Sequence, residues 1–250
     1  MIRNPILKAL SSIRRSGART LLMGGQACVL YGAAEFSRDL DLLILVSPDN
    51  LARVRAGLDE LLAQPIAVPV TQPPLSPELL MRGHAFHFRC HRPDVEGLRI
   101  DIMSVLRDVL PFDELWERRE TLEIEGELID LLSVEDLARA KQTQRNKDWP
   151  ILERLVDRVY FDVRESPSPE NMDFLLRQLR NPELLMEFVA KFPSEAQEFA
   201  PRRPTIQAAL SGDIEQVRAA LRIEQDEAIL RDRLWWEPLK RELEQFRHQR

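Results

Sequence analysis

The longest uninterrupted aliphatic run in the chain is short and directly follows two acidic residues. Residues 42–46 are all Leu, Ile or Val, which is far fewer than the roughly 20 apolar residues that a membrane-spanning helix needs. Asp39, Leu40 and Asp41 stand immediately before this run, and Ser47 and Pro48 end it. The pattern predicts a β-strand over residues 39–46 that begins with two carboxylates. We expect no membrane-spanning segment and no membrane partner.

Length and composition are those of an ordinary globular protein. The chain has 250 residues, of which 44% are hydrophobic and 30% are charged. These values exclude collagen, a long coiled coil and wholesale disorder, and they suit one or two domains. The net charge of −6, from 35 Lys and Arg against 41 Asp and Glu, disfavours a protein that binds DNA over its whole surface. It leaves room for a local basic cleft.

The cysteine content and the N-terminus predict a cytoplasmic protein. Cys28 and Cys90 are the only two cysteines, too few for a disulfide framework, so a reducing compartment is the default. Residues 1–15 mix Arg and Lys with apolar residues, and no apolar core region or cleavage site follows. We therefore expect no signal peptide.

The first half of the chain alternates between strand and helix patterns. Five prolines in residues 64–77 predict an exposed loop. A hairpin is expected over residues 121–132, with Glu125 and Gly126 at its turn. Further strands are expected at 20–23, 84–90 and 98–105, and helices at 2–14, 26–31, 49–63 and 112–119.

The sequence pattern of the second half predicts helices throughout. Ser133 followed by Asp136 resembles a capping box and starts a helix that we expect to reach about residue 145. From residue 165 onward only helical patterns remain, separated by prolines. We place a domain boundary near 132. The predicted fold class is α/β (α+β): a small mixed sheet flanked by helices over residues 1–132, then a helical domain over residues 133–250.

Two carboxylates at the start of a strand are a candidate cation site. Asp39 and Asp41 are two residues apart, so on a strand they point to the same face, roughly 6.6 Å apart along it. Carboxylates this close repel, which raises the pKa of one of them unless a cation lies between them. Mg²⁺ suits such oxygen ligands and keeps open positions for substrate phosphates.

A third acid lies on a strand that could pair beside the first. Asp101 stands among apolar residues at 98–103, where a solvent-exposed Asp would be unusual. Three convergent carboxylates can hold two metal ions about 3.5–4 Å apart, the arrangement used for in-line displacement at phosphorus. We therefore predict that Asp39, Asp41 and Asp101 are metal ligands for two Mg²⁺ ions.

A glycine pair precedes these acids at the junction of a strand and a helix. Gly24 and Gly25 carry no Cβ atoms, so the backbone can approach a phosphate closely, and a helix start offers free N–H groups. Thirteen residues separate the pair from Asp39. That length holds one short helix and a turn, enough to place a phosphate cradle beside the acids.

This combination resembles the nucleotidyltransferase superfamily, which includes DNA polymerase β. The segment from Ser37 to Leu42 is especially similar to the small bacterial branch, with its minimal and aminoglycoside nucleotidyltransferases and AbiEii-type toxins. The resemblance implies that Asp39 and Asp41 bind both metals. It also implies that Asp101 binds the catalytic metal and helps to deprotonate an attacking hydroxyl. Gly24, Gly25, Ser37 and Arg38 would then contact the nucleoside triphosphate (NTP).

A second match lies downstream. Residues 135–148 resemble a helix of bacterial members that carries a lysine, an arginine four residues later, and a Lys-Asp pair. Lys141 and Arg145 would share one helix face and neutralise the triphosphate and the departing pyrophosphate, with Asp148 orienting one of them. The match covers residues 18–160. Two positions depart from it: many relatives have Arg where this chain has Glu35, and Thr where it has Ser37.

The resemblance implies a Mg²⁺-dependent nucleotidyltransferase that moves a nucleotide (NMP) from an NTP to an acceptor hydroxyl and releases pyrophosphate. The alternatives are a catalytically silent binding module of the same fold, and the toxin of a toxin–antitoxin pair with an antitoxin partner. The acceptor stays open between an antibiotic, a tRNA 3′ end, a protein side chain and a small metabolite. A zinc site from His84, His87, Cys90 and His91 is disfavoured, since a strand would turn His87 away from His84 and Cys90.

Overall fold

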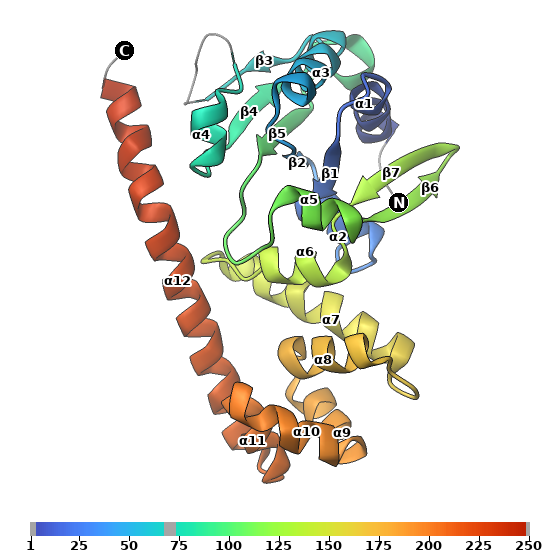
Figure 1. Cartoon of the computed structure of the whole chain (residues 1–250), viewed down its shortest axis with the longest axis vertical. Coiled ribbons are helices and arrows are strands. Elements are labelled where there is room, and N and C mark those ends of the chain that lie inside the picture. The colour runs from blue at the N-terminus through green and yellow to red at the C-terminus, as the bar shows by residue number, and fades with distance from the viewer. Residues whose placement is uncertain (1–3, 68–73, 249–250) are drawn as a thin grey trace. The chain divides into compact units, whose positions relative to one another are not determined.

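The chain divides into two compact units. A computed structural model describes residues 4–67 and 74–248 (Figure 1). The sheet unit comprises residues up to Ala140 together with the segment from Trp235 onward, and the helical unit comprises Lys141–Leu234. The first division falls after Ala140, and the end of the chain, from Trp235 onward, belongs to the sheet unit.

The sheet unit is built on a seven-stranded mixed sheet with the order β3-β4-β5-β2-β1-β7-β6. β1 pairs antiparallel with β2, whereas β2 pairs parallel with β5 and β1 pairs parallel with β7. This sheet, together with its helices and the helical unit, confirms the predicted fold class. The strands are β1 (Thr20–Met23), β2 (Leu40–Ile44), β3 (Gln64–Pro65), β4 (Phe86–Arg89), β5 (Arg99–Met103), β6 (Glu120–Ile124) and β7 (Glu127–Leu131).

Serine residues cap several helices of the sheet unit. Ser47 accepts a hydrogen bond from the Asn50 N–H (3.3 Å), and Ser133, the predicted cap, accepts one from the Asp136 N–H (3.2 Å). The helices are α1 (Asn4–Arg15), α2 (Gly24–Leu30), α3 (Pro48–Glu60), α4 (Pro77–Met81), η1 (Pro93–Val95), α5 (Phe112–Glu117) and α6 (Val134–Ala140). The predicted proline-rich loop thus contains β3 and the start of α4, and residues 68–73 lie outside the described part.

The central strands separate an aliphatic face from a polar one. In β2, Leu40, Leu42 and Ile44 are fully buried, and in β5 so are Ile100 and Ile102. Because successive residues of a strand point to opposite faces, the residues between them lie on the other side of the sheet. Burial of the aliphatic face fixes the register of both strands, since a shift by one residue would expose it.

The last part of the chain docks on the sheet unit through a buried histidine. Helix α12 (Ile214–His248) ends in this unit. Its Glu242 contacts the His84 ring (2.5 Å) and Arg82 (2.6 Å), and His84 is 1% exposed. His84 precedes β4 instead of lying within it, so the predicted strand begins two residues too early.

Prolines of the helical unit mark helix starts. Pro169, Pro182, Pro193 and Pro204 each occupy the first turn of a helix, where the missing N–H costs nothing. Pro238 instead lies inside α12. The elements are η2 (Asn146–Asp148), α7 (Trp149–Val163), α8 (Pro169–Gln178), α9 (Pro182–Lys191), α10 (Pro193–Phe199), η3 (Ala200–Arg202), α11 (Pro204–Leu210) and the first part of α12.

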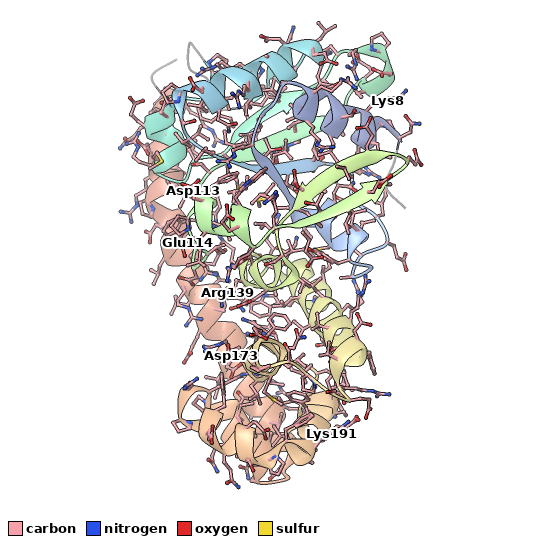
Figure 2. The ribbon with its side chains drawn as sticks, turned by 45° about the vertical axis from the view of Figure 1, so that its right-hand side comes forward. Lys8, Asp113, Glu114, Arg139, Asp173 and Lys191 are labelled. Atoms are coloured by element: carbon pink, nitrogen blue, oxygen red, sulfur yellow. The ribbon has the colours of Figure 1, made fainter. Side chains whose placement is uncertain are left out.

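One buried arginine ties the helical unit together. Arg203 forms an ion pair with Glu224 on α12 (2.9 Å) and donates to the carbonyls of Leu176 and Leu179 at the end of α8. Other charges, such as Lys191 in this unit and Lys8 in the sheet unit, are exposed (Figure 2). Among the described residues, no helix combines the length and apolarity that a membrane crossing requires.

The docking of α12 gives the first prediction. Glu242→Ala removes the partner of the buried His84, so the free energy of unfolding is expected to fall by about 1.5–3 kcal/mol. Urea unfolding followed by far-UV circular dichroism measures it. Glu244→Ala, an exposed position on the same helix, serves as control and is expected to stay within about 0.5 kcal/mol of wild type. Equal losses in both variants would contradict the docking role.

Asp157 on α7 gives a pH-dependent prediction. Burial and the negative charge of Glu153 raise the pKa of the Asp157 carboxyl to about 6, although a hydrogen bond with Asn181 acts in the opposite direction. The Oδ1 atom of Asp157 is buried without a hydrogen-bond partner. The neutral form is favoured in the folded protein. The stability that the protonated Asp157 contributes is therefore complete below the ordinary pKa of an aspartate, about 3.9. This contribution is lost as the pH rises through about 6.

Asp157→Asn is accordingly expected to stabilise the protein by about 1 kcal/mol at pH 7.5, a value reduced for solvent screening, and to have little effect at pH 4. Thermal unfolding at the two pH values checks this. The exposed Asp226→Asn is the control. A benefit of Asp157→Asn that is the same at both pH values would be inconsistent with a titrating carboxyl.

Candidate active site

A row of polar side chains crosses the polar face of the sheet. Asp41 on β2 is paired in register with Asp101 on β5, and Asp101 is paired with His87 on β4. Residues paired across strands point to the same face and lie about 5 Å apart. Asp39 stands directly before β2 and is exposed. The structure therefore brings Asp41 and Asp101 side by side, on the two strands that the sequence suggested could pair. The predicted strand over residues 39–46 is longer than β2, and its first carboxylate, Asp39, lies outside the strand.

Asp101 is held by a two-pronged contact from Arg99. The Arg99 guanidinium donates from Nε to Oδ1 (2.7 Å) and from Nη2 to Oδ2 (3.0 Å) of Asp101. The His87 ring nitrogen Nδ1 lies 2.8 Å from the same Oδ1 atom. The side chain of Asp101 is 13% exposed, and that of Arg99 is 40% exposed. Both oxygens of the third carboxylate thus already have cationic or polar partners.

Charges at this site shift two pKa values. Burial raises the pKa of Asp101, but hydrogen bonds and charges from His87 and Arg99 outweigh burial, so the net pKa is lowered. The hydrogen bond to Asp101 raises the pKa of Arg99, and the charges of Asp101, Asp39 and Asp41 add to this. Arg99 is therefore a cation that interacts electrostatically with all three predicted metal ligands.

The glycine pair lies directly against the acids. Gly24 has φ +67°, and a Cβ atom there would lie 2.0 Å from Oδ2 of Asp41. A Cβ atom on Gly25 would lie 2.5 Å from the Ser37 hydroxyl. Any side chain at either position would collide with a predicted site residue. The absence of Cβ atoms is thus required by how closely the backbone at the start of α2 approaches Asp41 and Ser37.

Gln26 positions the loop that leads to the acids. This buried side chain donates from Nε2 to the Ser37 carbonyl (2.7 Å) and so links α2 to the segment before β2. Arg38, a predicted nucleotide contact, is exposed and its guanidinium lies over the Phe36 ring, 5.6 Å from the centroid. Ser37 and Arg38 therefore flank the acids, and their contact with a nucleotide stays a prediction.

Lys141 and Arg145 lie in the helical unit and not on a helix. Helix α6 ends at Ala140, and residues 141–145 form a turn and a loop, so the predicted helix to residue 145 is wrong. The physical reason is the side chain of Asp148, 3% exposed, which accepts hydrogen bonds from Thr143 (2.6 Å) and Arg145 (2.8 Å) and pairs with Lys141 (3.4 Å). These contacts stabilise a compact loop instead of another helical turn.

Asp148 is the shared partner of the two basic residues of this loop, and its orienting role toward a phosphate stays a prediction. It contacts both basic residues, and although burial raises its pKa, the charge of Lys141 and the contacts with Thr143 and Arg145 lower it overall. Lys141 is 7% exposed, whereas Arg145 is 58% exposed. Arg145 is thus the cation of this loop that is open to a ligand.

The donor set suits Mg²⁺ by its chemistry, because all three predicted ligands are carboxylates. Asp39 directly precedes β2, Asp41 lies on β2, and Asp101 lies opposite Asp41 on β5. Within the described ranges 4–67 and 74–248, no three Asp, Glu, His or Cys residues stand close enough together, as they are arranged, to hold a metal ion. The oxygens of Asp101 are in contact with Arg99 and His87 instead. Metal binding by the three acids stays a prediction.

Sequence reasoning missed three of these residues. Arg99 stands two positions before Asp101, so strand alternation alone places it on the same face. His87 could be matched to Asp101 only once the β4–β5 register was known. No sequence pattern points to a role for Gln26. Cys90 is buried, and burial raises the pKa of its thiol to about 11, which makes it a poor metal ligand at neutral pH.

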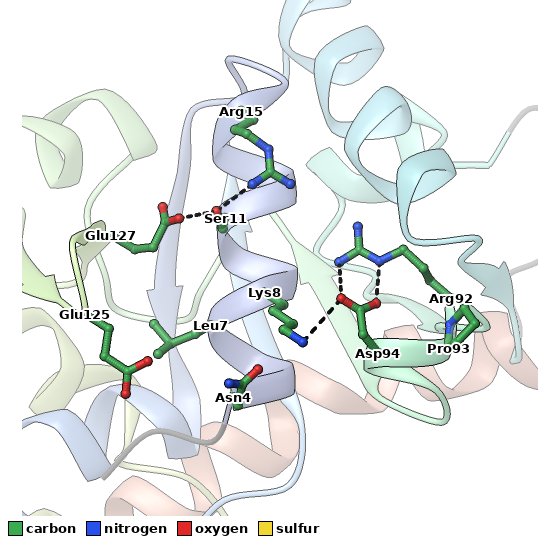
Figure 3. Close-up of a pocket in the computed structure, with 10 residues that line it drawn as sticks. All are labelled: Asn4, Leu7, Lys8, Ser11, Arg15, Arg92, Pro93, Asp94, Glu125 and Glu127. Atoms are coloured by element: carbon green, nitrogen blue, oxygen red, sulfur yellow. Dashed lines mark hydrogen bonds and ion pairs between the residues drawn. The ribbon is translucent and has the colours of Figure 1, made fainter.

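The two described cavities lie away from these residues. A cavity of about 640 Å³ is bordered by α1, η1 and the β6–β7 hairpin (Figure 3). Three of its charged residues contact one another, since Asp94 contacts Lys8 (3.7 Å) and Arg92 (2.7 Å). A second cavity of about 360 Å³ lies between α8 and α10 in the helical unit. No predicted site residue lines either cavity.

Gly24→Ala tests the close approach of backbone and carboxylate. The added Cβ would displace Asp41, so the free energy of unfolding is expected to fall by about 1–3 kcal/mol more than in a control. Gly126→Ala is the matched control, because Gly126 also has positive φ (+81°) but nothing lies within 4 Å of its Cβ position. Chemical denaturation of both variants gives the comparison. Similar losses would mean that only backbone strain matters at Gly24.

Comparisons with known proteins find structural neighbours only. No protein-family model and no curated protein matches the chain. A candidate nucleotidyltransferase from Helicobacter pylori is 16% identical with a TM-score of 0.41, over 91% of this chain and 93% of that one. JHP933 from Helicobacter pylori is 15% identical with a TM-score of 0.38, over 94% of each chain. An antigenic nucleotidyltransferase-like protein from Paracoccidioides brasiliensis is 18% identical with a TM-score of 0.36, over 82% of this chain and 92% of that one.

Proposed function

We propose that this protein is a Mg²⁺-dependent nucleotidyltransferase that moves a nucleotide from an NTP to an acceptor hydroxyl and releases pyrophosphate. One observation carries the proposal. Asp41 and Asp101 are paired in register on parallel strands, and the backbone of Gly24 lies directly against the Asp41 carboxylate. The proposed metal ligands Asp41 and Asp101 and the proposed phosphate contact Gly24 are therefore neighbours in the fold.

The acids are proposed to hold the cation and the reacting groups. Asp39 and Asp41 would hold two Mg²⁺ ions, and Asp101 would be a further ligand of the catalytic one. Bound Mg²⁺ would supply charge neutralisation at the α-phosphate and lower the pKa of the acceptor hydroxyl. Asp101 accepts the proton of that hydroxyl as the new oxygen–phosphorus bond forms and the bond to pyrophosphate breaks. Most of the rate enhancement then comes from positioning and electrostatics.

The phosphates are assigned to two segments. Gly24 and Gly25, which lie against Asp41 and Ser37, are proposed to contact the β- and γ-phosphates through their backbone. Lys141 and Arg145, which Asp148 holds in one loop of the helical unit, stay predicted contacts of the triphosphate. Ser37 and Arg38 are proposed to contact the nucleotide from the loop before Asp39.

The acceptor is the open part of the proposal. A small molecule, a tRNA end and a protein side chain each offer a hydroxyl that this chemistry can use. A toxin that modifies its host would differ from the other cases only in the acceptor. A silent binding module would bind the nucleotide without transferring it, so transfer itself separates that alternative from the enzyme.

Asp41→Asn tests the proposal, because it removes a charge from the centre of the acid row. In wild type, at least one of ATP, GTP, CTP and UTP with Mg²⁺ is expected to raise the melting temperature by roughly 2–4 °C at a concentration 100 times its Kd. Asp41→Asn is expected to lose this shift. Transfer of α-labelled nucleotide to the components of a cell extract is expected to fall by at least about a hundredfold.

The matched control is Asp59→Asn, an exposed carboxylate on α3, which is expected to behave as wild type in both assays. Nucleotide binding without transfer would support the silent module. Normal transfer by Asp41→Asn would rule out the proposed metal site.

A further inference from the structure

Both oxygens of the Asp101 carboxylate have a partner before any substrate is present. Oδ1 accepts from Arg99 Nε (2.7 Å) and lies 2.8 Å from the His87 ring, while Oδ2 accepts from Arg99 Nη2 (3.0 Å). A guanidinium that binds both oxygens of a carboxylate has the geometry of a strong, charge-assisted pair. A metal ion that binds Asp101 therefore meets the positive charge of Arg99 at the same two oxygens.

Arg99 is also placed to serve the other two acids. Its positive charge interacts with Asp39 and Asp41 as well as with Asp101. It stands two residues before Asp101 on β5, so both side chains lie on the polar face of the sheet. With 40% of its side chain exposed, the guanidinium can move into solvent without disturbing the core. It is therefore a removable counter-ion and not a fixed part of the interior.

We infer that Arg99 competes with a divalent cation for Asp101, so that the metal completes its ligand set only when Arg99 releases this carboxylate. The inference rests on the proposed function and deepens it, because it names the residue that sets metal affinity. Arg99 lowers the repulsion among the acids in the metal-free protein and weakens metal binding by the same interaction. In the loaded site, the released guanidinium is available to a phosphate, which makes metal and NTP binding mutually favourable.

Arg99 is thus a positioning residue that acts through Asp101, because it holds both oxygens of this carboxylate until a cation displaces it.

Mn²⁺ titration of the full-length protein, followed by electron paramagnetic resonance of the free ion, tests the inference without any activity assay. Arg99→Gln is expected to bind Mn²⁺ at least tenfold more tightly than wild type, because the competitor is gone. Arg99→Lys, which keeps the charge but cannot bind both oxygens, is expected to lie between the two. The matched control is Arg89→Gln, which removes an exposed arginine on the strand position paired with Arg99 and is expected to change the affinity less than threefold.

The outcomes separate the two proposals. If Asp41→Asn loses Mn²⁺ binding but Arg99→Gln binds no more tightly than Arg89→Gln, the inference about Arg99 is wrong and the metal site stands. If Asp41→Asn binds Mn²⁺ as wild type does, or if no variant binds at millimolar Mn²⁺, the metal site fails and the inference fails with it. Thermal unfolding in the absence of metal establishes that each variant is folded.

Discussion

Mutual repulsion among three carboxylates is the constraint on which the sheet unit depends. Asp41 and Asp101 are neighbours across β2 and β5, and Asp39 directly precedes β2. Like charges at this distance are unfavourable unless a cation lies among them. In this structure Arg99 is that cation, with His87 as a further partner of Asp101. The arrangement is stable without substrate and is suited to exchange one cation for another.

The fold enforces this crowding from the opposite side of the sheet. Asp41 alternates along β2 with three fully buried residues, Leu40, Leu42 and Ile44. A strand that slipped by one residue would bury the carboxylate and expose the leucines, so the apolar core fixes the acids on the polar face. Gly24 adds a second restraint, because its bare backbone occupies the space beside Asp41. Core packing and the chemistry of the candidate site thus depend on the same register.

Local patterns predicted what depends on local chemistry. A strand after Asp39, the cap at Ser133, and the hairpin turn at Glu125 and Gly126 each follow from neighbouring residues. The structure has the cap and the turn, and it has the strand at Leu40–Ile44, shorter than the predicted range 39–46. The predicted end of α6 is wrong because Thr143 and Arg145 donate hydrogen bonds to Asp148, and these bonds stabilise a loop over residues 141–145. Helix propensity does not take such contacts into account. The partners of Asp101 and His84 were out of reach, since both depend on pairings between distant segments.

A crystal structure of the full-length protein with Mn²⁺ and a non-hydrolysable NTP analogue would test the central claim most directly. The expected result is anomalous Mn²⁺ density bound by Asp39, Asp41 and Asp101, with the guanidinium of Arg99 turned away from Asp101. Density for Mn²⁺ and nucleotide elsewhere, with Arg99 still bound to both oxygens of Asp101, would contradict the account.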